Sequence, residues 1–415
     1  MLTFSPSKKN NSNESKYMSL KEKIRSLAQE YHQDVVACRR HLHQNPELSF
    51  QEFETQKFVE RKLDEFGITD HTRMANTGVV AIIKGKNPDS RVVALRGDMD
   101  ALPIQETNKK DYASQNAGVM HACGHDVHTS SLLGAGRILN KLKDQFEGTI
   151  KLIFQPGEEK LPGGASMMIK EGVLENPKPH SVIGQHVMPQ IDAGKAGFRK
   201  GLYMASTDEI YVTVTGKGGH GAMPHLTIDP VLIASNMIVS LQQIVSRHAK
   251  PSVPSVLSFG KFIANGATNV IPDSVYLEGT FRTLDEEWRN EAHRKIKLLA
   301  ESIVEGMGGK VDFNIVRGYP FLINNEALTG RVQGYAEEYL GNDKVEALEI
   351  WMAAEDFAFF SQQAEACFYR LGVRNEQKGI TSSVHTSTFD IDETALETGI
   401  GLMAWIAVRE LEAAS

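Results

Sequence analysis

The segment from His121 to His128 gathers residue types that bind metals. It contains three histidines, at positions 121, 125 and 128, together with Cys123. Imidazole and thiolate groups are borderline or soft ligands for transition metals, and Gly124 frees the backbone to aim two of them at one point. The segment therefore indicates a metal site, although a buried cysteine with histidines at the start of a helix has the same pattern.

Two adjacent carboxylates, Glu158 and Glu159, follow the apolar run 150–154. Neighbouring side chains on a turn can point in different directions, so one can bind a metal while the other transfers protons. Metal-assisted hydrolysis needs this pairing, because the ion lowers the pKa of water and a general base removes the proton. Taken alone, such a pair is more typical of two solvated acids on a surface turn.

Further candidate ligands stand beside apolar residues. His186 and His385 each have apolar neighbours, a setting in which a single histidine is more often a hydrogen-bonded core residue. Asp98 and Asp100 follow the apolar run 92–95, where aspartate also serves as a helix cap or turn residue. The combination of all these residues, rather than any one of them, favours a catalytic metal site.

These polar residues follow short apolar runs rich in β-branched side chains, which predict buried strands. The runs occupy residues 79–83, 92–95, 150–154 and 181–184. Apolar residues at helical spacing predict helices at 20–31, 58–66 and 132–142. Strands that alternate with helices are typical of an α/β sheet, in which ligands bind at the carboxyl ends of the strands. We therefore predict one shared site at that edge of the sheet.

The pattern changes between about Tyr203 and Asn314. Alternating strands and two long amphipathic helices in this segment predict an inserted α+β domain. The predicted strands are 210–214, 256–259 and 275–280, and the predicted helices are 230–247 and 286–305. The first pattern then returns, with a strand at 367–371 and a helix at 393–411. We predict a disordered tail (1–18), a catalytic domain (19–201 and 315–415) and an inserted domain (202–314).

Composition restricts the class of partner. The chain has 415 residues and a formal net charge of −7, which gives no electrostatic basis for binding nucleic acid or an anionic membrane. No apolar run approaches the roughly 20 residues of a membrane span, and the first residues lack the apolar core of a secretory signal. Three widely spaced cysteines argue against a disulfide framework. We expect a cytoplasmic enzyme that acts on a small molecule.

In order and spacing, the motifs of this chain resemble the amidohydrolase branch of the dinuclear metallopeptidase family, which contains aminoacylases, hippurate hydrolases and auxin-conjugate hydrolases. The resemblance runs from about Val35 to Val408. The motifs that carry it are HLHQNPELSF at 41–50, GDMDALP at 97–103, HACGHDVHT at 121–129, QPGEE at 155–159, GGHGAMPH at 218–225, NVIPD at 269–273 and EDF at 355–357. The wider family usually begins its site with a His-x-Asp motif, whereas this chain has Asp98-Met99-Asp100, as the amidohydrolase branch does.

The resemblance implies a role for each site residue. The implied metal ligands are Cys123, His125, Glu159, His186 and His385. Glu158 is implied as the general base, and Asp100 as the residue that orients a ligand. In the inserted domain, His220 is implied to polarise the scissile carbonyl with the assistance of Asn269. The implied fold is a mixed sheet flanked by helices with a dinuclear metal site, plus an α+β lid and dimerisation domain.

We therefore predict an amidohydrolase that converts N-acyl amino acids, such as N-acetyl or hippurate-like conjugates, to a carboxylic acid and an amino acid. Two divalent transition-metal ions per chain, Zn, Mn, Co or Ni, would assist, in a homodimer or higher homo-oligomer. One alternative is a cysteine amidase that uses Cys123 with His125 or His128, which leaves both glutamates without a task. Another is an inactive metal-binding homologue.

Overall fold

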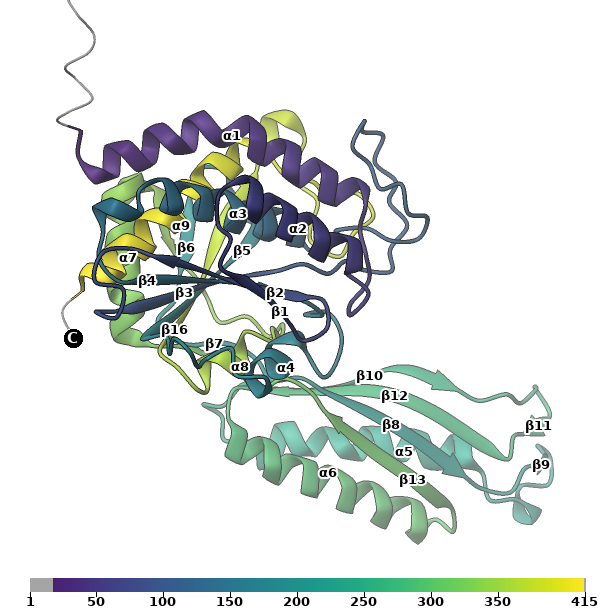
Figure 1. The fold of residues 1–415 in the computed structure, drawn as a ribbon. Coiled ribbons are helices and arrows are strands. Elements are labelled where there is room, and N and C mark those ends of the chain that lie inside the picture. Colours follow the sequence, from purple (N-terminus) through teal and green to yellow (C-terminus); the bar gives the residue numbers. More distant parts are fainter. Residues whose placement is uncertain (1–17, 414–415) are drawn as a thin grey trace, which may run out of the picture.

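The computed structural model describes residues 18–413, which form a larger α/β body and an elongated second body (Figure 1). A mixed eight-stranded sheet crosses the larger body in the order β1-β2-β4-β3-β5-β16-β6-β15. Its strands are β1 (His71–Met74), β2 (Gly78–Lys84), β3 (Val92–Asp98), β4 (Thr149–Gln155), β5 (Ser181–Asp192), β6 (Ala196–Phe198), β15 (Val345–Ala347) and β16 (Ala366–Arg374). Strands β4, β3, β5 and β16 are mutually parallel, so their carboxyl ends meet at one edge.

Helices cover both faces of this sheet, which confirms the predicted fold class (Figure 1). One face carries α1 (Leu20–Gln44), α2 (Phe53–Glu65), α3 (His125–Lys141) and α9 (Thr394–Glu412), with α7 (Glu326–Leu340) beside α9. The opposite face carries the short helices α4 (Gly164–Lys170) and α8 (Ala358–Ser361). Helix α1 extends well past its predicted end at residue 31, because apolar residues continue to be buried as far as Leu42.

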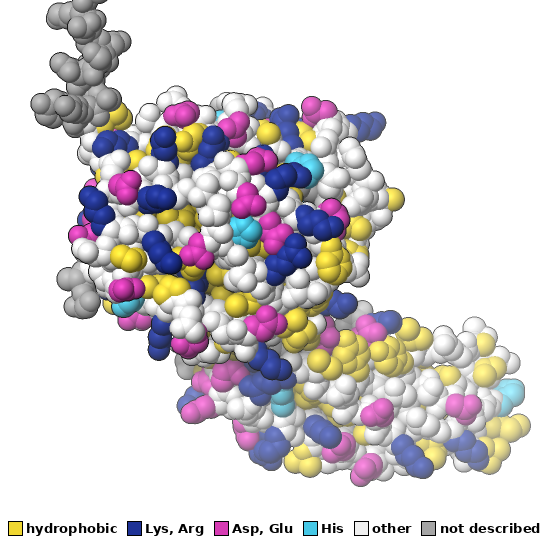
Figure 2. All heavy atoms as spheres, in the orientation of Figure 1, with side chains coloured by type: hydrophobic (Ala, Val, Ile, Leu, Met, Phe, Trp, Pro, Cys, Tyr) yellow, Lys and Arg dark blue, Asp and Glu magenta, His cyan; other side chains and the backbone are white. Residues whose placement is uncertain are grey.

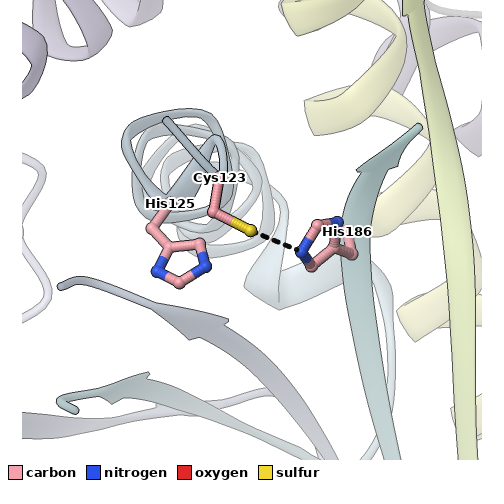
Figure 3. A group of neighbouring side chains, drawn as sticks. All are labelled: Cys123, His125 and His186. Atoms are coloured by element: carbon pink, nitrogen blue, oxygen red, sulfur yellow. Dashed lines mark hydrogen bonds between the residues drawn. The ribbon is translucent and has the colours of Figure 1, made fainter. Parts of the chain in front are cut away.

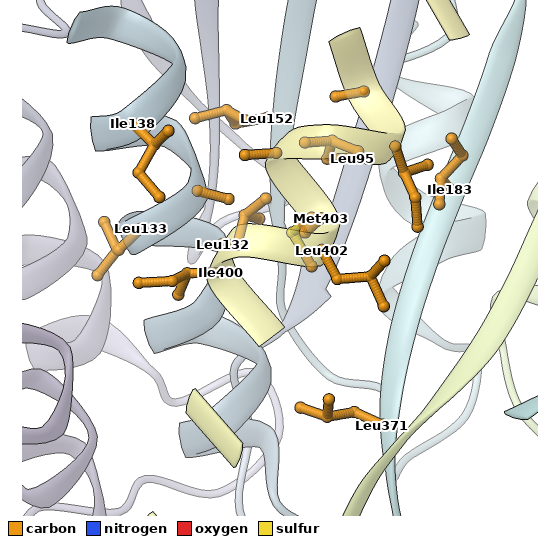
Figure 4. Close-up of a cluster of buried hydrophobic side chains, with 14 of the residues drawn as sticks. Leu95, Leu132, Leu133, Ile138, Leu152, Ile183, Leu371, Ile400, Leu402 and Met403 are labelled. Carbon is orange, nitrogen blue, oxygen red and sulfur yellow. The ribbon is translucent and has the colours of Figure 1, made fainter. Parts of the chain in front are cut away.

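Side chains along the central strands alternate between the two faces of the sheet, so each face packs against a hydrophobic core. In β3, Val93 and Leu95 point toward α3 and α9, whereas Ala94 lies in the opposite cluster. Figure 4 shows side chains of α3 and α9 packed against Leu95 and neighbouring strand residues. Gly134 lets these two helices approach closely, because a Cβ there would lie 2.6 Å from a side-chain carbon of Ile400. This packing fixes the position of α3, whose first turn belongs to the site.

The second body is built on a four-stranded antiparallel sheet with the order β10-β12-β8-β13. Its strands are β8 (Asp208–Thr215), β10 (Ser255–Ile263), β12 (Ser274–Thr283) and β13 (Lys310–Arg317), and α5 (Pro230–Gln243) and α6 (Glu286–Gly306) pack against it around a separate core. A π-helical turn, Ile244–His248, follows α5. The short strands β9 (Gly219–His220) and β11 (Val270–Ile271) pair at the far tip (Figure 1).

The expected boundaries of the insert fall inside strands. Residue 202 lies in β7 (Gly201–Met204), which pairs with β14 (Leu322–Asn324) rather than with the sheet of the second body, and residue 314 lies within β13. The four-stranded sheet itself runs from Asp208 to Arg317. Of the predicted tail, residues 1–17 lie outside the described residues. No helix within residues 18–413 combines the length and apolar character needed to span a bilayer.

Candidate active site and metal centre

The predicted site residues gather at the carboxyl edge of the parallel strands. Asp100 follows β3, Glu158 and Glu159 follow β4, and His186 lies within β5. His125 is the first residue of α3, where Gly124 adopts a φ of 83° and a Cβ would lie 2.6 Å from a methyl carbon of Val187. Only glycine fits that left-handed turn, which directs the start of α3 toward β5.

Five groups of side chains among the described residues could hold a metal ion, and three of them consist only of predicted site residues. Cys123, His125 and His186 form the first of these three (Figure 3). All three side chains are buried, and their ligand atoms lie within 4.8 Å of one another. The Cys123 Sγ is 3.4 Å from the His186 Nε2. Two soft or borderline donors so close together, on different elements, are typical of a transition-metal site.

The second group joins Cys123 to Glu159 and His385. The His385 Nε2 lies 3.3 Å from the Cys123 Sγ and 3.2 Å from a Glu159 carboxylate oxygen. His385 has a φ of 60°, which is unusual for a residue other than glycine, and its backbone N–H donates to the Ala122 carbonyl. Hydrogen bonds to Cys123 and Glu159 raise the pKa of His385 to about 10, so these surroundings favour positive charge.

An unpaired polar atom indicates that these residues fit metal ions. The His125 Nε2 is buried and has no hydrogen-bond partner among residues 18–413, and it lies 3.9 Å from the Glu159 Oε1. Leaving buried donors and acceptors unpaired costs free energy, so each such group calls for an explanation. A cation coordinated by both atoms supplies one, and the third group, His125 with Glu158 and Glu159, lies at the same place.

Asp100 is placed to orient His125. One Asp100 oxygen lies 3.1 Å from the His125 Nδ1, while the other accepts hydrogen bonds from the Ser49 hydroxyl and the Glu159 backbone N–H. A carboxylate at Nδ1 leaves the Nε2 of the ring facing the other ligands, as is usual for histidines that bind metals. Asp100 therefore connects the first and third groups without facing the cavity itself.

His128 has a different task from its neighbours. Its Nδ1 lies 2.5 Å from an Asp98 oxygen, and its Nε2 accepts the backbone N–H of Val187. Burial lowers the pKa of His128, which keeps the ring neutral and able to accept that hydrogen bond. Because both ring nitrogens are engaged, His128 is not available as the base of a cysteine amidase. Burial and the charge of Glu159 also raise the pKa of the Cys123 thiol, which disfavours a free thiolate nucleophile.

Glu158 lies at the base of the cavity and is only 6% exposed. Burial, with further contributions from Glu355 and Glu159, raises the pKa of Glu158 well above its ordinary value. One of its oxygens lies 4.0 Å from the His125 Nε2, and its backbone carbonyl accepts the Tyr319 hydroxyl. A carboxyl group with a raised pKa can both take up a proton and release it to a leaving group.

Beneath the site lies a buried arginine that we did not predict from the sequence. Arg96 donates hydrogen bonds to Asp98, Gln155, Glu355 and Asp356. It balances a group of buried acids that would otherwise repel one another and Glu158. The available signal was an arginine inside an apolar strand, since a buried arginine requires acidic partners.

A cavity of about 550 Å³ opens in front of these residues. One wall consists of the predicted site residues at the sheet edge: Cys123, Glu158, Glu159, His186 and His385. The other lining residues include Met204, Trp351 and Arg370, together with Thr207 and Arg282 from the base of the second body. His220 and Asn269 do not line it. Both are exposed at the tip of the second body, where His220 belongs to β9 and Asn269 directly precedes β11 (Figure 1). A single chain thus brings together the predicted ligands and Glu158 but not His220 or Asn269.

Comparison with known families agrees with this geometry. The model of peptidase family M20/M25/M40 matches residues 94–409, which is more than half of the chain. The chain belongs to this family. The match spans six of the seven motifs, from 97–103 to 355–357, and it confirms the family resemblance inferred from them.

Individual M20 relatives cover most of the chain. The N-acyl-L-amino acid amidohydrolase of Geobacillus stearothermophilus is 45% identical over 73% of this chain and 81% of its own length. The IAA-amino acid hydrolase ILR1-like 5 of Arabidopsis thaliana is 39% identical over 91% of this chain and 86% of its own. Among solved M20 structures, the YXEP protein of Bacillus subtilis, described as a dinuclear metal-binding peptidase, superposes with a TM-score of 0.77 at 33% identity, covering 93% of this chain and 100% of that one.

Proposed function

We propose that this chain is a metal-dependent amidohydrolase that cleaves N-acyl amino acids into a carboxylic acid and an amino acid. The observation that carries this proposal is that Cys123, His125, Glu159, His186 and His385 form overlapping groups of candidate metal ligands beside Glu158. The names of the Geobacillus and Arabidopsis relatives both describe hydrolysis of an amide formed by an amino acid, which supports the same substrate class.

The five ligands would hold two divalent ions, and the oxygen, nitrogen and sulfur donors suit Zn, Mn, Co or Ni. When bound, such ions polarise the amide carbonyl and lower the pKa of water. Glu158 takes the proton from the attacking water and delivers it to the leaving nitrogen, a transfer for which its raised pKa is suited. Asp100 keeps the Nε2 of His125 directed at the ligand group through its contact at Nδ1.

His220 and Asn269 act, in this proposal, on the cavity of a second subunit, because their own cavity lies at the other end of the second body. The edge strand β10 and the outer face of α5 expose Phe262, Ile263, Leu232 and Val239, which are apolar side chains able to pack in a dimer. Figure 2 shows hydrophobic side chains on the surface of the second body. We infer that this body serves as a lid and dimerisation domain in a cytoplasmic enzyme.

The direct test is a substrate panel with the purified full-length protein, loaded in turn with each candidate metal. We expect release of free amino acid from N-acetyl and N-benzoyl amino acids, measured by an amine-specific reagent. Glu158→Gln, carrying the same metal, is the matched control for contaminating hydrolases. Absence of hydrolysis with every metal and every N-acyl amino acid would contradict the proposal.

A further inference from the structure

Among residues 18–413, four arginine side chains are completely buried: Arg39, Arg96, Arg289 and Arg370. The first three have acidic partners. Arg39 pairs with Asp126 and Asp390, Arg96 with Asp98, Glu355 and Asp356, and Arg289 with Asp208 and Glu286. Arg370 forms no such pair, since no carboxylate oxygen of residues 18–413 lies within the 4.0 Å that defines an ion pair.

The partners that Arg370 does have are uncharged. Its Nε donates to the Tyr203 hydroxyl at 2.7 Å, and its Nη2 lies 3.0 Å from the Met204 sulfur. The rings of Tyr203, Trp351 and Phe368 lie 4.9 to 5.4 Å from the guanidinium carbon. Aromatic faces and a thioether hold the guanidinium in place, but they do not neutralise its charge.

The Nη1 of Arg370 is buried and has no hydrogen-bond partner among the described residues. A guanidinium carries five N–H donors in a fixed plane, and its geometry matches a carboxylate with two parallel hydrogen bonds. Removing an unpaired charge from water costs free energy, so a buried guanidinium without an acidic partner calls for an anion. The unpaired Nη1 of Arg370 indicates where that anion binds.

The position of Arg370 relates this anion to catalysis. Arg370 lines the same cavity as Cys123, Glu158 and His385. It also stands directly opposite His186 in the parallel pairing of β16 with β5. The side chains of two residues at the same register point to the same face of the sheet, so an anion on Arg370 lies beside the proposed metal centre.

The nearest candidate for an internal counter-ion is Glu355, which lines the same cavity. Its carboxylate is already engaged, because it accepts hydrogen bonds from Arg96 and from the Phe357 backbone N–H. An internal partner for Arg370 is therefore absent from residues 18–413, whereas the cavity is open to a molecule from outside.

We propose that Arg370 binds a carboxylate group of the substrate inside the catalytic cavity. The inference rests on the proposed function, because an N-acyl amino acid carries an α-carboxylate near the amide that is cut. A carboxylate on the acyl chain, as in an N-succinyl compound, offers the same chemistry. In either case Arg370 is a specificity residue that anchors one end of the substrate, while Trp351 and Met204 form the apolar wall beside it.

The test compares binding of three compounds to metal-loaded Glu158→Gln protein, in which turnover is suppressed. N-acetyl-L-methionine has only the α-carboxylate, N-acetyl-L-methioninamide has none, and N-succinyl-L-methioninamide has only the acyl carboxylate. Titration calorimetry gives the three affinities. We expect one of the two acids to bind about 10–100-fold more tightly than the neutral amide, as a charge-assisted hydrogen-bond pair allows. The acid that gains affinity identifies the source of the carboxylate.

The variant Arg370→Met, placed in the same background, should remove that preference and leave affinity for N-acetyl-L-methioninamide within about twofold. Arg374→Met is the matched control, because Arg374 lies on the same strand but pairs with Asp192 outside the cavity. Metal content and melting temperature are measured for each variant. If Arg370→Met fails to fold, Tyr203→Phe, which removes one partner of Arg370, should reduce the preference instead.

Two results would overturn the inference. One is equal affinity for the acids and the neutral amide in protein with Arg370 intact. The other is an equal loss of affinity for charged and neutral compounds in Arg370→Met. The second result would mark a structural role. Failure of the proposed function is a separate outcome, in which the protein with Glu158 intact hydrolyses none of the three compounds. The binding comparison still decides the role of Arg370 in that case.

Discussion

The edge of the central sheet and the tip of the second body both carry residues that sequence motifs assign to catalysis, but the two regions are built differently. At the sheet edge, buried hydrogen bonds join Asp100 to the candidate ligand His125 and Ser49 to Asp100, and His128 accepts the backbone N–H of Val187, the residue after His186. At the tip, His220 is exposed, and its ring accepts the backbone N–H of Ala222. The first region is preorganised within a single chain, whereas the second needs another protein surface to complete a site.

Removal of metal should produce the largest effect of the series. It acts on the sheet edge and leaves the tip of the second body intact. Dialysis against a chelator is expected to lower the turnover of an N-acyl amino acid by more than about 10³-fold, since the polarisation of carbonyl and water is lost together. Readdition of the ion should restore the rate, with about two ions bound per chain by elemental analysis. Full activity in protein shown to be metal-free would contradict the assignment.

Substitutions of the two adjacent glutamates should impair the enzyme in different ways. Glu158→Gln is expected to retain its metal and lose about 10²–10⁴-fold in kcat, the usual contribution of general acid–base catalysis. Glu159→Ala should instead lose metal affinity, because its carboxylate belongs to two of the ligand groups. Metal content and kcat are measured for both variants. The reverse pattern, with metal lost only from Glu158→Gln, would exchange the two roles.

A substitution at His220 tests the role of the tip of the second body. His220→Ala should lower kcat about 10²-fold without changing metal content, because a donor to the developing oxyanion is lost. The exposed neighbour His225 is the matched control, and His225→Ala should have little effect.

Mixing inactive His220→Ala with inactive Glu158→Gln subunits decides where His220 acts. One site of a mixed dimer then contains both intact residues, so part of the activity should return. No recovery under conditions where subunits demonstrably exchange would limit His220 to its own chain or remove it from the mechanism.

Asp100 should give the smallest effect of the series. Asp100→Ala is expected to weaken metal affinity about 10–100-fold, because the His125 ring loses the group that orients it. Ser49→Ala removes a single hydrogen bond to Asp100 and should cost less, about threefold to tenfold. Competition with a metal-binding dye measures both. An unchanged affinity in Asp100→Ala would show that the fold alone holds His125 in place.

Local patterns in the sequence were sufficient for much of the framework. The apolar runs at 79–83, 92–95, 150–154 and 181–184 coincide with β2, β3, β4 and β5, because burial on both faces demands apolar residues throughout. Strand β13 and helix α7 were not predicted. In β13 most side chains remain partly or fully exposed, so the apolar pattern on which such predictions depend is weak.

The residue types of the site were determined by the sequence, and the family match agrees with the motifs that contain them. Their convergence was decided only by the tertiary structure, which brings His385 within 3.3 Å of Cys123 across 262 positions of the chain. Periodicity is a local property, whereas the distance between strands depends on sheet order and packing. For the same reason the sequence shows an arginine at position 370, and only its folded surroundings show that it has no acidic partner among the described residues.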